Sequence, residues 1–382
     1  MEKKKFRGLN RETSMLGHGI MRLMTAEDGT VNIQESIDLI RYGIDRGITY
    51  IDTAYNYHGG RSEMIVGKAL KDGYREKVIL ADKMPIWLAK TEEDLERFFS
   101  KQLQRLDVEH IDMYLIHNII KPNWRKTQKL NVLSFLEQKK AEGNIDNIGF
   151  SFHGDLELFR EVIDSFPWSF CQIQLNFLDK DIQAGLKGLE YAREHGVDVI
   201  VMEPLKGGRI TDKIPPTVQK LWDEAKEKGI IEAERTPAKT AFKWVASQPG
   251  VIQILSGMNS KEQMDENIAI FSDTELFSIS REEAELINKV AAEYNRLVRY
   301  QCTKCEYCLP CEKKLNIPGI IEYLNSWYAF EKNPSTATEY KNWTAPGHHA
   351  SDCIGCGKCE ENCPQSLPII QIMKEAAEEF GQ

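Results

Sequence analysis

The chain has 382 residues, which fits two domains or one large barrel with an appendage. Hydrophobic residues make up 42% and charged residues 28%, so a disordered chain and a small disulfide-stabilised fold are both excluded. The 49 basic and 58 acidic residues give a net charge of -9, which argues against nucleic acid or an anionic membrane as a partner.

Short apolar segments alternate with amphipathic ones along most of the chain. Isoleucines recur at helical spacing from Ile33 to Ile44, Gly47 can end that helix, and the apolar segment 48–52 follows at once. The predicted strands are 16–23, 48–52, 78–82, 111–116, 147–151, 170–175, 197–202 and 251–255. The predicted helices cover 31–47, 61–71, 91–106, 129–142, 155–165, 184–195 and 237–247, and a last one begins at 260.

Eight strand-helix units predict a parallel sheet closed into a (β/α)8 TIM barrel, an α/β fold. An open doubly wound sheet is the alternative, but no G-x-G-x-x-G turn follows any strand. The connection between 202 and 237 is long enough for a lid or a binding loop. We expect the barrel to cover residues 1–295.

Ionisable side chains lie at the ends of three neighbouring predicted strands. Asp52 ends one strand, Lys83 follows the next, His117 follows the third, and Tyr57 lies five residues beyond Asp52. Each alone could be a helix cap, a solvated loop residue or a core histidine. Their common position at the carboxyl ends of barrel strands, where catalytic groups gather, favours an active site.

These four side chains suit proton transfer to a carbonyl oxygen. The Lys83 ammonium would lower the pKa of the Tyr57 hydroxyl, Asp52 would orient Lys83, and His117 could donate to the substrate oxygen. With these residues, the stretch DTAYNYHGGRSEMIVGKAL and the segment YLIH resemble the aldo-keto reductase family over about residues 7–290. The resemblance implies a nicotinamide coenzyme, usually NADP(H), with Tyr57 as general acid/base, Lys83 and Asp52 as its tuning pair, and His117 orienting the carbonyl.

The resemblance also implies where the coenzyme binds. Ser151 and Gln172 match positions that hold the nicotinamide carboxamide, while Asn176 matches a more structural position. The segment SGMNSKEQMDEN resembles the adenosine-phosphate segment, and its Ser260 to Gln263 part also reads as a capping box at a helix start. The further implied contacts are Leu205, Lys206, Gly207, Gly208, Arg209, Gly257, Ser260, Gln263, Glu266 and Asn267.

Three positions depart from the family pattern. Phe152 stands in place of a common asparagine, Leu175 in place of a stacking aromatic, and Gln263 in place of an arginine that often binds the 2'-phosphate. The loss of the aromatic side chain at Leu175 would leave room for a flavin, which is the alternative to NADP(H).

Eight of the nine cysteines lie within 62 residues near the C-terminal end, and the ninth, Cys171, lies in a predicted strand. Such clustering indicates metal binding rather than disulfides in a reducing compartment. The run that begins at Cys353 has C-x2-C-x2-C-x3-C-P spacing, which is typical of 4Fe-4S ferredoxins; zinc is the alternative. The first run has an x2 gap before its last cysteine. We expect a ferredoxin-like domain over 296–382.

In two-cluster ferredoxins the fourth cysteine of each run binds the other cluster. That rule predicts two 4Fe-4S clusters. Cluster one would have the ligands Cys302, Cys305, Cys308 and Cys363, and cluster two would have Cys311, Cys353, Cys356 and Cys359.

The whole chain resembles the aldo-keto reductases that carry a C-terminal 4Fe-4S module. We expect an oxidoreductase that acts on a small carbonyl compound, with Trp87 and Trp124 among the pocket walls and an external electron carrier as a further partner. A flavin-dependent reductase and a non-catalytic redox-sensing or electron-transfer protein are the alternatives. With no apolar stretch of about 18 residues and no signal-like start, we expect a cytoplasmic protein without membrane contact.

Overall fold

The computed structural model describes residues 1–9, 11–25, 30–211, 214–329, 332, 334–344 and 346–381. The chain forms two compact units, each made of two segments. The first contains Met1–Pro204 and Ala241–Ser278, and the second contains Leu205–Thr240 and Ile279–Gln382. This division differs from the predicted one at 295/296, because an inner segment groups with the C-terminal part of the chain. No helix of the described residues is long and apolar enough to cross a membrane.

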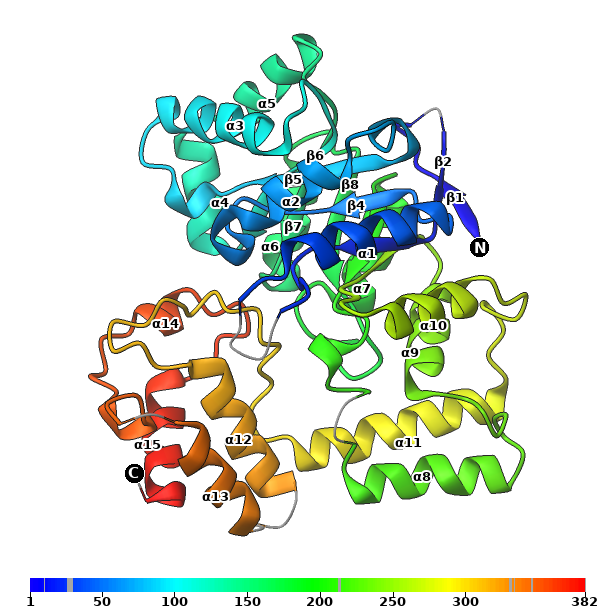
Figure 1. The fold of residues 1–382 in the computed structure, drawn as a ribbon, viewed down its shortest axis with the longest axis vertical. Helices are drawn as coiled ribbons and strands as arrows, with labels where there is room; N and C mark the ends of the chain where they lie inside the picture. Colours follow the sequence, from blue (N-terminus) through cyan, green and yellow to red (C-terminus); the bar gives the residue numbers. More distant parts are fainter. Residues whose placement is uncertain are drawn as a thin grey trace. The chain divides into compact units, whose positions relative to one another are not determined.

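The first unit is built on a closed barrel of eight parallel strands, which confirms the predicted fold (Figure 1). The barrel closes where β10 pairs with β3 on one side and with β9 on the other. The strands are β3 (Leu16–Gly19), β4 (Tyr50–Asp52), β5 (Ile79–Met84), β6 (Ile111–Ile119), β7 (Ile145–Phe152), β8 (Phe170–Gln174), β9 (Asp198–Met202) and β10 (Val251–Ser256).

A short antiparallel hairpin precedes the barrel, with strands β1 (Lys3–Lys5) and β2 (Glu12–Ser14). Phe6 follows β1, is 1% exposed, and lies with its ring centroid 6.0 Å from that of Tyr50. It packs in one apolar cluster with first residues of barrel strands, among them Tyr50, Ile79 and Phe170. The hairpin therefore covers the amino ends of the strands, opposite the end where the predicted site lies.

Helices connect the strands in the predicted alternation, with one local difference. The bounds are α1 (Ile33–Asp45), α2 (Arg61–Ala69), α3 (Glu92–Leu106), α4 (Lys121–Lys129), α5 (Val132–Ala141), α6 (Leu156–Asp164), α7 (Gly185–Glu194), α9 (Pro237–Ala246) and α10 (Lys261–Phe271). The helix predicted over 129–142 is wrong at its start, because Asn131 has a φ of 49° and separates α4 from α5. Asparagine tolerates this left-handed conformation better than most residues.

Close packing explains several small residues in the stretch DTAYNYHGGRSEMIVGKAL, which includes helix α2. Gly60, with a φ of 87°, precedes the helix, and the Ser62 hydroxyl contacts the Ile20 carbonyl and the Thr53 hydroxyl, both at 2.8 Å. A Cβ atom on Gly67 would lie 2.5 Å from the Leu106 carbonyl oxygen. Glycine at 67 is therefore required by the close approach of α2 to the end of α3.

The second unit is helical. The long connection after β9 contains helix α8 (Pro216–Glu227), which contacts α11 (Arg281–Leu297) and lies beside it (Figure 1). The expectation of a simple lid or binding loop is therefore incomplete. The remaining helices are α12 (Ile317–Ala329), α13 (Pro334–Trp343), α14 (Lys358–Glu361) and α15 (Ile369–Phe380). Helices α12 and α15 pack around a separate apolar core that contains Ile320, Leu324 and Ile372.

Candidate active site and cysteine clusters

A buried lysine is the centre of the site in the barrel. Lys83, in β5, is 1% exposed, and its Nζ donates to Asp52 Oδ1 at 2.6 Å and to the Thr53 carbonyl at 2.7 Å. Asp52 is the last residue of the neighbouring strand β4, so parallel pairing brings the two side chains together. Burial raises the pKa of the Asp52 carboxyl, and the Lys83 ammonium opposes this rise. The two residues form a buried ion pair.

The Tyr57 ring lies between this pair and a histidine. Tyr57 lies in the short helical turn Tyr57–Gly60, and Lys83 Nζ is 5.1 Å from the centre of its ring. The centroid of the His117 ring is 5.9 Å away, and the two rings are nearly perpendicular at 84°. The Trp87 ring contacts His117 from another direction, at 5.0 Å. The structure thus brings together Asp52, Tyr57, Lys83 and His117, and places Trp87 beside them.

His117 is held in its neutral form. It lies in β6 and is 1% exposed; burial, then the Lys83 charge and His153, lower the pKa of its imidazole well below the usual value. A neutral imidazole beside an ammonium can donate one N–H to a ligand oxygen without adding a second positive charge.

A layer of buried polar residues behind Lys83 was not predicted from the sequence. The Gln102 amide donates to the Lys83 carbonyl at 2.9 Å and accepts from the Tyr114 hydroxyl at 2.5 Å. Burial, then the charge of Glu63, raise the pKa of the adjacent Asp82 carboxyl. Glu63 itself accepts from Arg105 at 2.7 Å. The only sequence signal was a set of polar residues on otherwise apolar faces of α2 and α3.

Ser151 and Gln172 lie side by side because their strands pair at these two residues. The Ser151 hydroxyl accepts from the Asn118 backbone N–H at 2.8 Å. Within the described residues, the buried Oε1 atom of Gln172 has no hydrogen-bond partner. This oxygen and Ser151 can therefore receive a carboxamide. Asn118 was not predicted; its φ of 58° turns the chain directly after His117.

Three other positions singled out in the sequence are buried inside the protein. Asn176 donates to Asp179 and to the Glu203 carbonyl, both at 3.2 Å, and accepts from two backbone N–H groups, which agrees with its expected structural role. Leu175 is fully buried. Trp124 is also buried, and its Nε1 donates to Glu161 on α6 at 2.7 Å, so it packs between helices rather than forming a pocket wall.

The predicted adenosine-phosphate segment begins helix α10. Ser260 Oγ accepts from the Gln263 N–H at 3.2 Å, which is one half of the predicted capping box. Gln263 Oε1 accepts instead from the N–H of Asn259, one residue before the N-cap, at 3.0 Å, so the reciprocal half differs from the prediction. Asn267 is buried and donates to Ser256 at 3.0 Å, whereas Glu266 is exposed. Gly257 is the second residue of this segment and lies three residues before Ser260. The cap leaves a helix N-terminus of the kind that suits phosphate.

The other predicted coenzyme segment, Leu205–Arg209, belongs to the second unit. Lys206, Gly207 and Gly208 all have positive φ angles, of 49°, 65° and 92°. Arg209 extends toward the first cysteine run, where its Nη1 donates to the Cys302 carbonyl at 3.4 Å. The structure therefore gives Arg209 a partner that the family resemblance did not imply.

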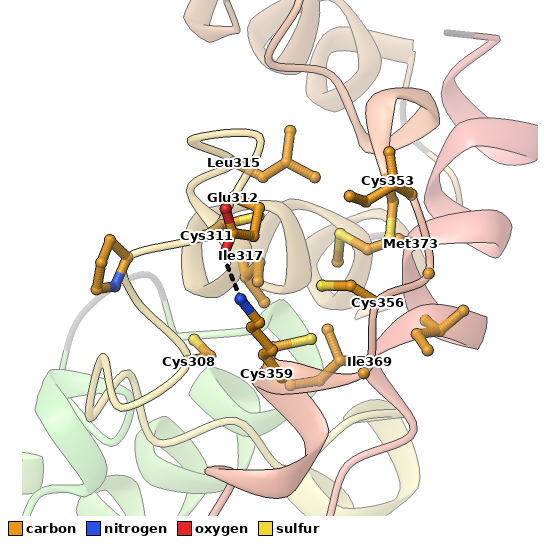
Figure 2. Close-up of a pocket in the computed structure, with 16 residues that line it drawn as sticks. Cys308, Cys311, Glu312, Leu315, Ile317, Cys353, Cys356, Cys359, Ile369 and Met373 are labelled. Atoms are coloured by element: carbon orange, nitrogen blue, oxygen red, sulfur yellow. Dashed lines mark hydrogen bonds and ion pairs between the residues drawn. The ribbon is translucent and has the colours of Figure 1, made fainter.

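The eight C-terminal cysteines are free thiols. One pocket is lined by Cys308 and Cys311 of the first run and by Cys353, Cys356 and Cys359 of the second (Figure 2). Burial raises the pKa of Cys308, and the nearby Cys302 and Cys363 raise it further. Cysteines of both runs therefore lie close to one another.

The surroundings of these thiols fit iron-sulfur clusters. The pocket wall also contains the apolar side chains of Leu315, Ile317, Ile369 and Met373 (Figure 2). Burial raises the pKa of the Cys363 thiol, and backbone groups at 365–367 oppose this rise. Apolar walls and N–H groups directed at sulfur are typical of protein sites for such clusters. Cys171, in contrast, is buried alone in β8.

A closed parallel barrel with buried Asp, Lys and His side chains around a half-buried Tyr, followed by a cysteine-rich module, defines an oxidoreductase of aldo-keto reductase type. Residues 15–292 match the model of the aldo/keto reductase family, and residues 301–367 match that of a 4Fe-4S dicluster domain. The chain belongs to the aldo-keto reductase family and carries a C-terminal 4Fe-4S domain.

Several proteins are similar to a large part of the chain. An NADH-specific methylglyoxal reductase from Escherichia coli is 29% identical in an alignment of length 307 that covers 71% of this chain and 92% of that protein. A probable aldo-keto reductase from Glycine max is 28% identical in an alignment of length 285 that covers 67% of this chain and 80% of that protein. A crystal structure from Klebsiella pneumoniae, with NADP and acetate, has 25% identity and a TM-score of 0.60, covering 76% of this chain and 96% of that one.

Proposed function

We propose that this protein reduces the carbonyl group of a small molecule, or oxidises the corresponding alcohol, with NADP(H) as coenzyme and Tyr57 as general acid/base. The observation that carries the proposal is the buried Lys83 ammonium, which is held by Asp52 and the Thr53 carbonyl and lies 5.1 Å from the Tyr57 ring. A cation in this place stabilises a tyrosinate.

In the reducing direction, the Tyr57 hydroxyl gives its proton to the substrate oxygen. The tyrosinate that remains is stabilised by the charge of Lys83, and Asp52 fixes the position of Lys83 Nζ at 2.6 Å from its Oδ1. A nicotinamide coenzyme, when bound, supplies the hydride for the carbonyl carbon. In the oxidising direction the tyrosinate accepts the proton of the alcohol, so one residue serves both directions.

His117 orients the substrate. Its imidazole stays neutral, so it donates a hydrogen bond to the same oxygen that receives the Tyr57 proton. Trp87 lies against His117 and provides an apolar wall beside the reacting carbon. These features favour a small carbonyl compound with an apolar substituent as the substrate class.

Coenzyme binding involves Ser151 and Gln172 at the nicotinamide end and the start of α10 at the phosphate end. The buried Gln172 oxygen supports a carboxamide ligand, since an unpaired oxygen in this position would otherwise carry a desolvation cost. Relatives differ in coenzyme: the Escherichia coli protein is NADH-specific, whereas the Klebsiella pneumoniae structure contains NADP. Binding of NADPH and NADH should therefore be measured side by side.

The cysteines bind two 4Fe-4S clusters, with the cross-paired ligand sets given above, and exchange single electrons with an external carrier. A cluster accepts one electron at a time, whereas nicotinamide transfers two electrons together as a hydride. Direct exchange between them needs an unfavourable nicotinamide radical. A flavin would remove this barrier, so extraction of organic cofactors distinguishes the two cases; a bound flavin would contradict the proposal for NADP(H).

The test of catalysis is Tyr57→Phe, which keeps the ring and removes the hydroxyl. Reduction of a panel of aldehydes and ketones should fall at least about a hundredfold, while NADPH affinity stays unchanged. Tyr55→Phe is the matched control: Tyr55 lies two residues earlier and packs on Phe98, so turnover should stay at the wild-type level. Unchanged turnover in Tyr57→Phe would contradict the assignment.

A further inference from the structure

Arg209 lies in a loop that is fixed within the second unit. The next residue, Ile210, is fully buried. The Tyr294 hydroxyl, from α11, lies 3.5 Å from the carbonyl oxygens of both Arg209 and Ile210. The backbone from which the Arg209 side chain extends therefore has a defined position next to α11.

The guanidinium of Arg209 reaches the segment that carries the first cysteine. Its Nη1 donates to the Cys302 carbonyl at 3.4 Å, across 93 positions of sequence. The Cys302 segment is itself held by Asn325 of α12, whose amide donates to the Tyr300 carbonyl at 2.7 Å and accepts from the Tyr300 N–H at 2.9 Å. Tyr294 thus lies against the backbone that carries Arg209, and Asn325 holds the segment that carries Cys302.

The charged group of Arg209 contacts a proposed cluster ligand directly, since its Nη1 donates to the Cys302 carbonyl at 3.4 Å. A second cation, Lys304, lies two residues along the chain, and its ammonium is 2.6 Å from Glu322. The Lys304 backbone N–H donates to the Cys302 sulfur at 3.4 Å. Removal of the Arg209 charge should therefore alter the field at Cys302.

We propose that Arg209 raises the reduction potential of cluster one, the cluster held by Cys302, Cys305, Cys308 and Cys363. The inference rests on the proposed function for the presence of the clusters. Reduction adds one electron to a group that is already negative, so a nearby cation stabilises the reduced state more than the oxidised one. Arg209 acts through Cys302 and does not bind the iron. It is therefore a positioning residue, which places a positive charge beside a ligand of the cluster.

The experiment is a redox titration followed by electron paramagnetic resonance, on protein prepared without air and without nucleotide. In Arg209→Gln, the reduction equilibrium of one cluster should become about tenfold less favourable, which corresponds to about 59 mV for a one-electron couple. The other cluster should keep its potential. In Arg209→Lys, which preserves the charge, the shift should be smaller.

Two further variants identify the cluster and the cause. In a Cys356→Ala background, where cluster two is lost, the remaining signal should still shift with Arg209→Gln. Arg281→Gln removes the same charge from α11, where the side chain is 88% exposed and paired with Glu285, and should leave both potentials unchanged.

The outcomes separate this inference from the proposed function. Two intact clusters with unchanged potentials in Arg209→Gln, or an equal shift of both, would overturn the inference and leave the proposed function standing. Protein without iron-sulfur clusters would overturn both. Because NADPH is absent from the titration, a role of Arg209 in coenzyme binding cannot produce the expected shift; NADPH affinity is measured separately.

Discussion

Lys83→Met should separate the structural role of the buried ion pair from its chemical role. The substitution leaves the Asp52 carboxylate buried without the ammonium that now lies 2.6 Å away. Breaking one partner out of a buried pair typically costs about 3–5 kcal/mol. We therefore expect the barrel to lose about this much stability, and carbonyl reduction to be lost as well.

The double variant Lys83→Met with Asp52→Asn removes both charges. Because a buried pair replaced as a whole is often close to neutral, most of the stability should return, while activity should not. Lys77→Met is the contrast: it breaks the exposed pair with Asp45, at 3.3 Å, and should cost at most about 1 kcal/mol.

Stability is best followed in the barrel alone, since the two units can unfold separately. Hydrogen exchange of peptides from β4, β5 and β6, measured against denaturant concentration, reports the opening free energy of this region. A Lys83→Met protein within about 0.5 kcal/mol of wild type would refute the reasoning, because a change of that size is typical of substitutions at exposed positions.

Three further predictions concern the clusters and pH. Protein prepared without air should contain about eight irons and eight sulfides, and Cys356→Ala should lose about four of each while the barrel stays folded; zinc in place of iron would contradict the cluster assignment. Adding NADPH to oxidised, flavin-free protein should reduce the clusters slowly or not at all, and rapid growth of the paramagnetic signal would show a direct relay. Burial lowers the pKa of His18 and of His153 to about 4, below the unfolded value near 6.5, so each adds stability that is complete above pH 6.5 and is lost as pH falls toward 4. In this range each histidine by itself should decrease the free energy of unfolding of the barrel by up to about 1.4 kcal/mol per pH unit, while Asp52 and Asp82, whose pKa values are raised by burial, act in the opposite direction. A pH dependence of stability that stays the same in His18→Asn and His153→Asn would contradict the burial of the two rings.

The barrel could be predicted because each strand is a short apolar run followed by a helix of different periodicity. Each predicted strand overlaps one of β3–β10, and the polar residues at the strand ends indicate three members of the candidate site. Parallel pairing then determines which of these residues meet, as with Asp52 and Lys83. The layer behind Lys83 could not be predicted in the same way, because Gln102 and Glu63 lie on helices whose rotation about their axes the sequence does not determine.

The sequence of helix α8 carries a local helical signal. Pro216 is a favoured first residue of a helix, and Val218, Trp222 and Ala225 recur at helical spacing and are buried. The length of the connection had suggested a loop. The pairing of Arg209 with Cys302 is different in kind, since it depends on packing between segments 93 residues apart and leaves no local pattern in the sequence.

The composition of the second unit has a practical consequence for exchanging parts between proteins. Because Leu205–Thr240 packs with Ile279–Gln382, the cysteine module is discontinuous in the gene, interrupted by the last strand of the barrel. Fusing only the residues after 295 to another reductase would omit α8 and the Arg209 loop. It would also omit most of α11, the helix that α8 contacts. A transplant that preserves the module must therefore carry both segments. In the sequence of the recipient, its own last barrel strand must lie between them.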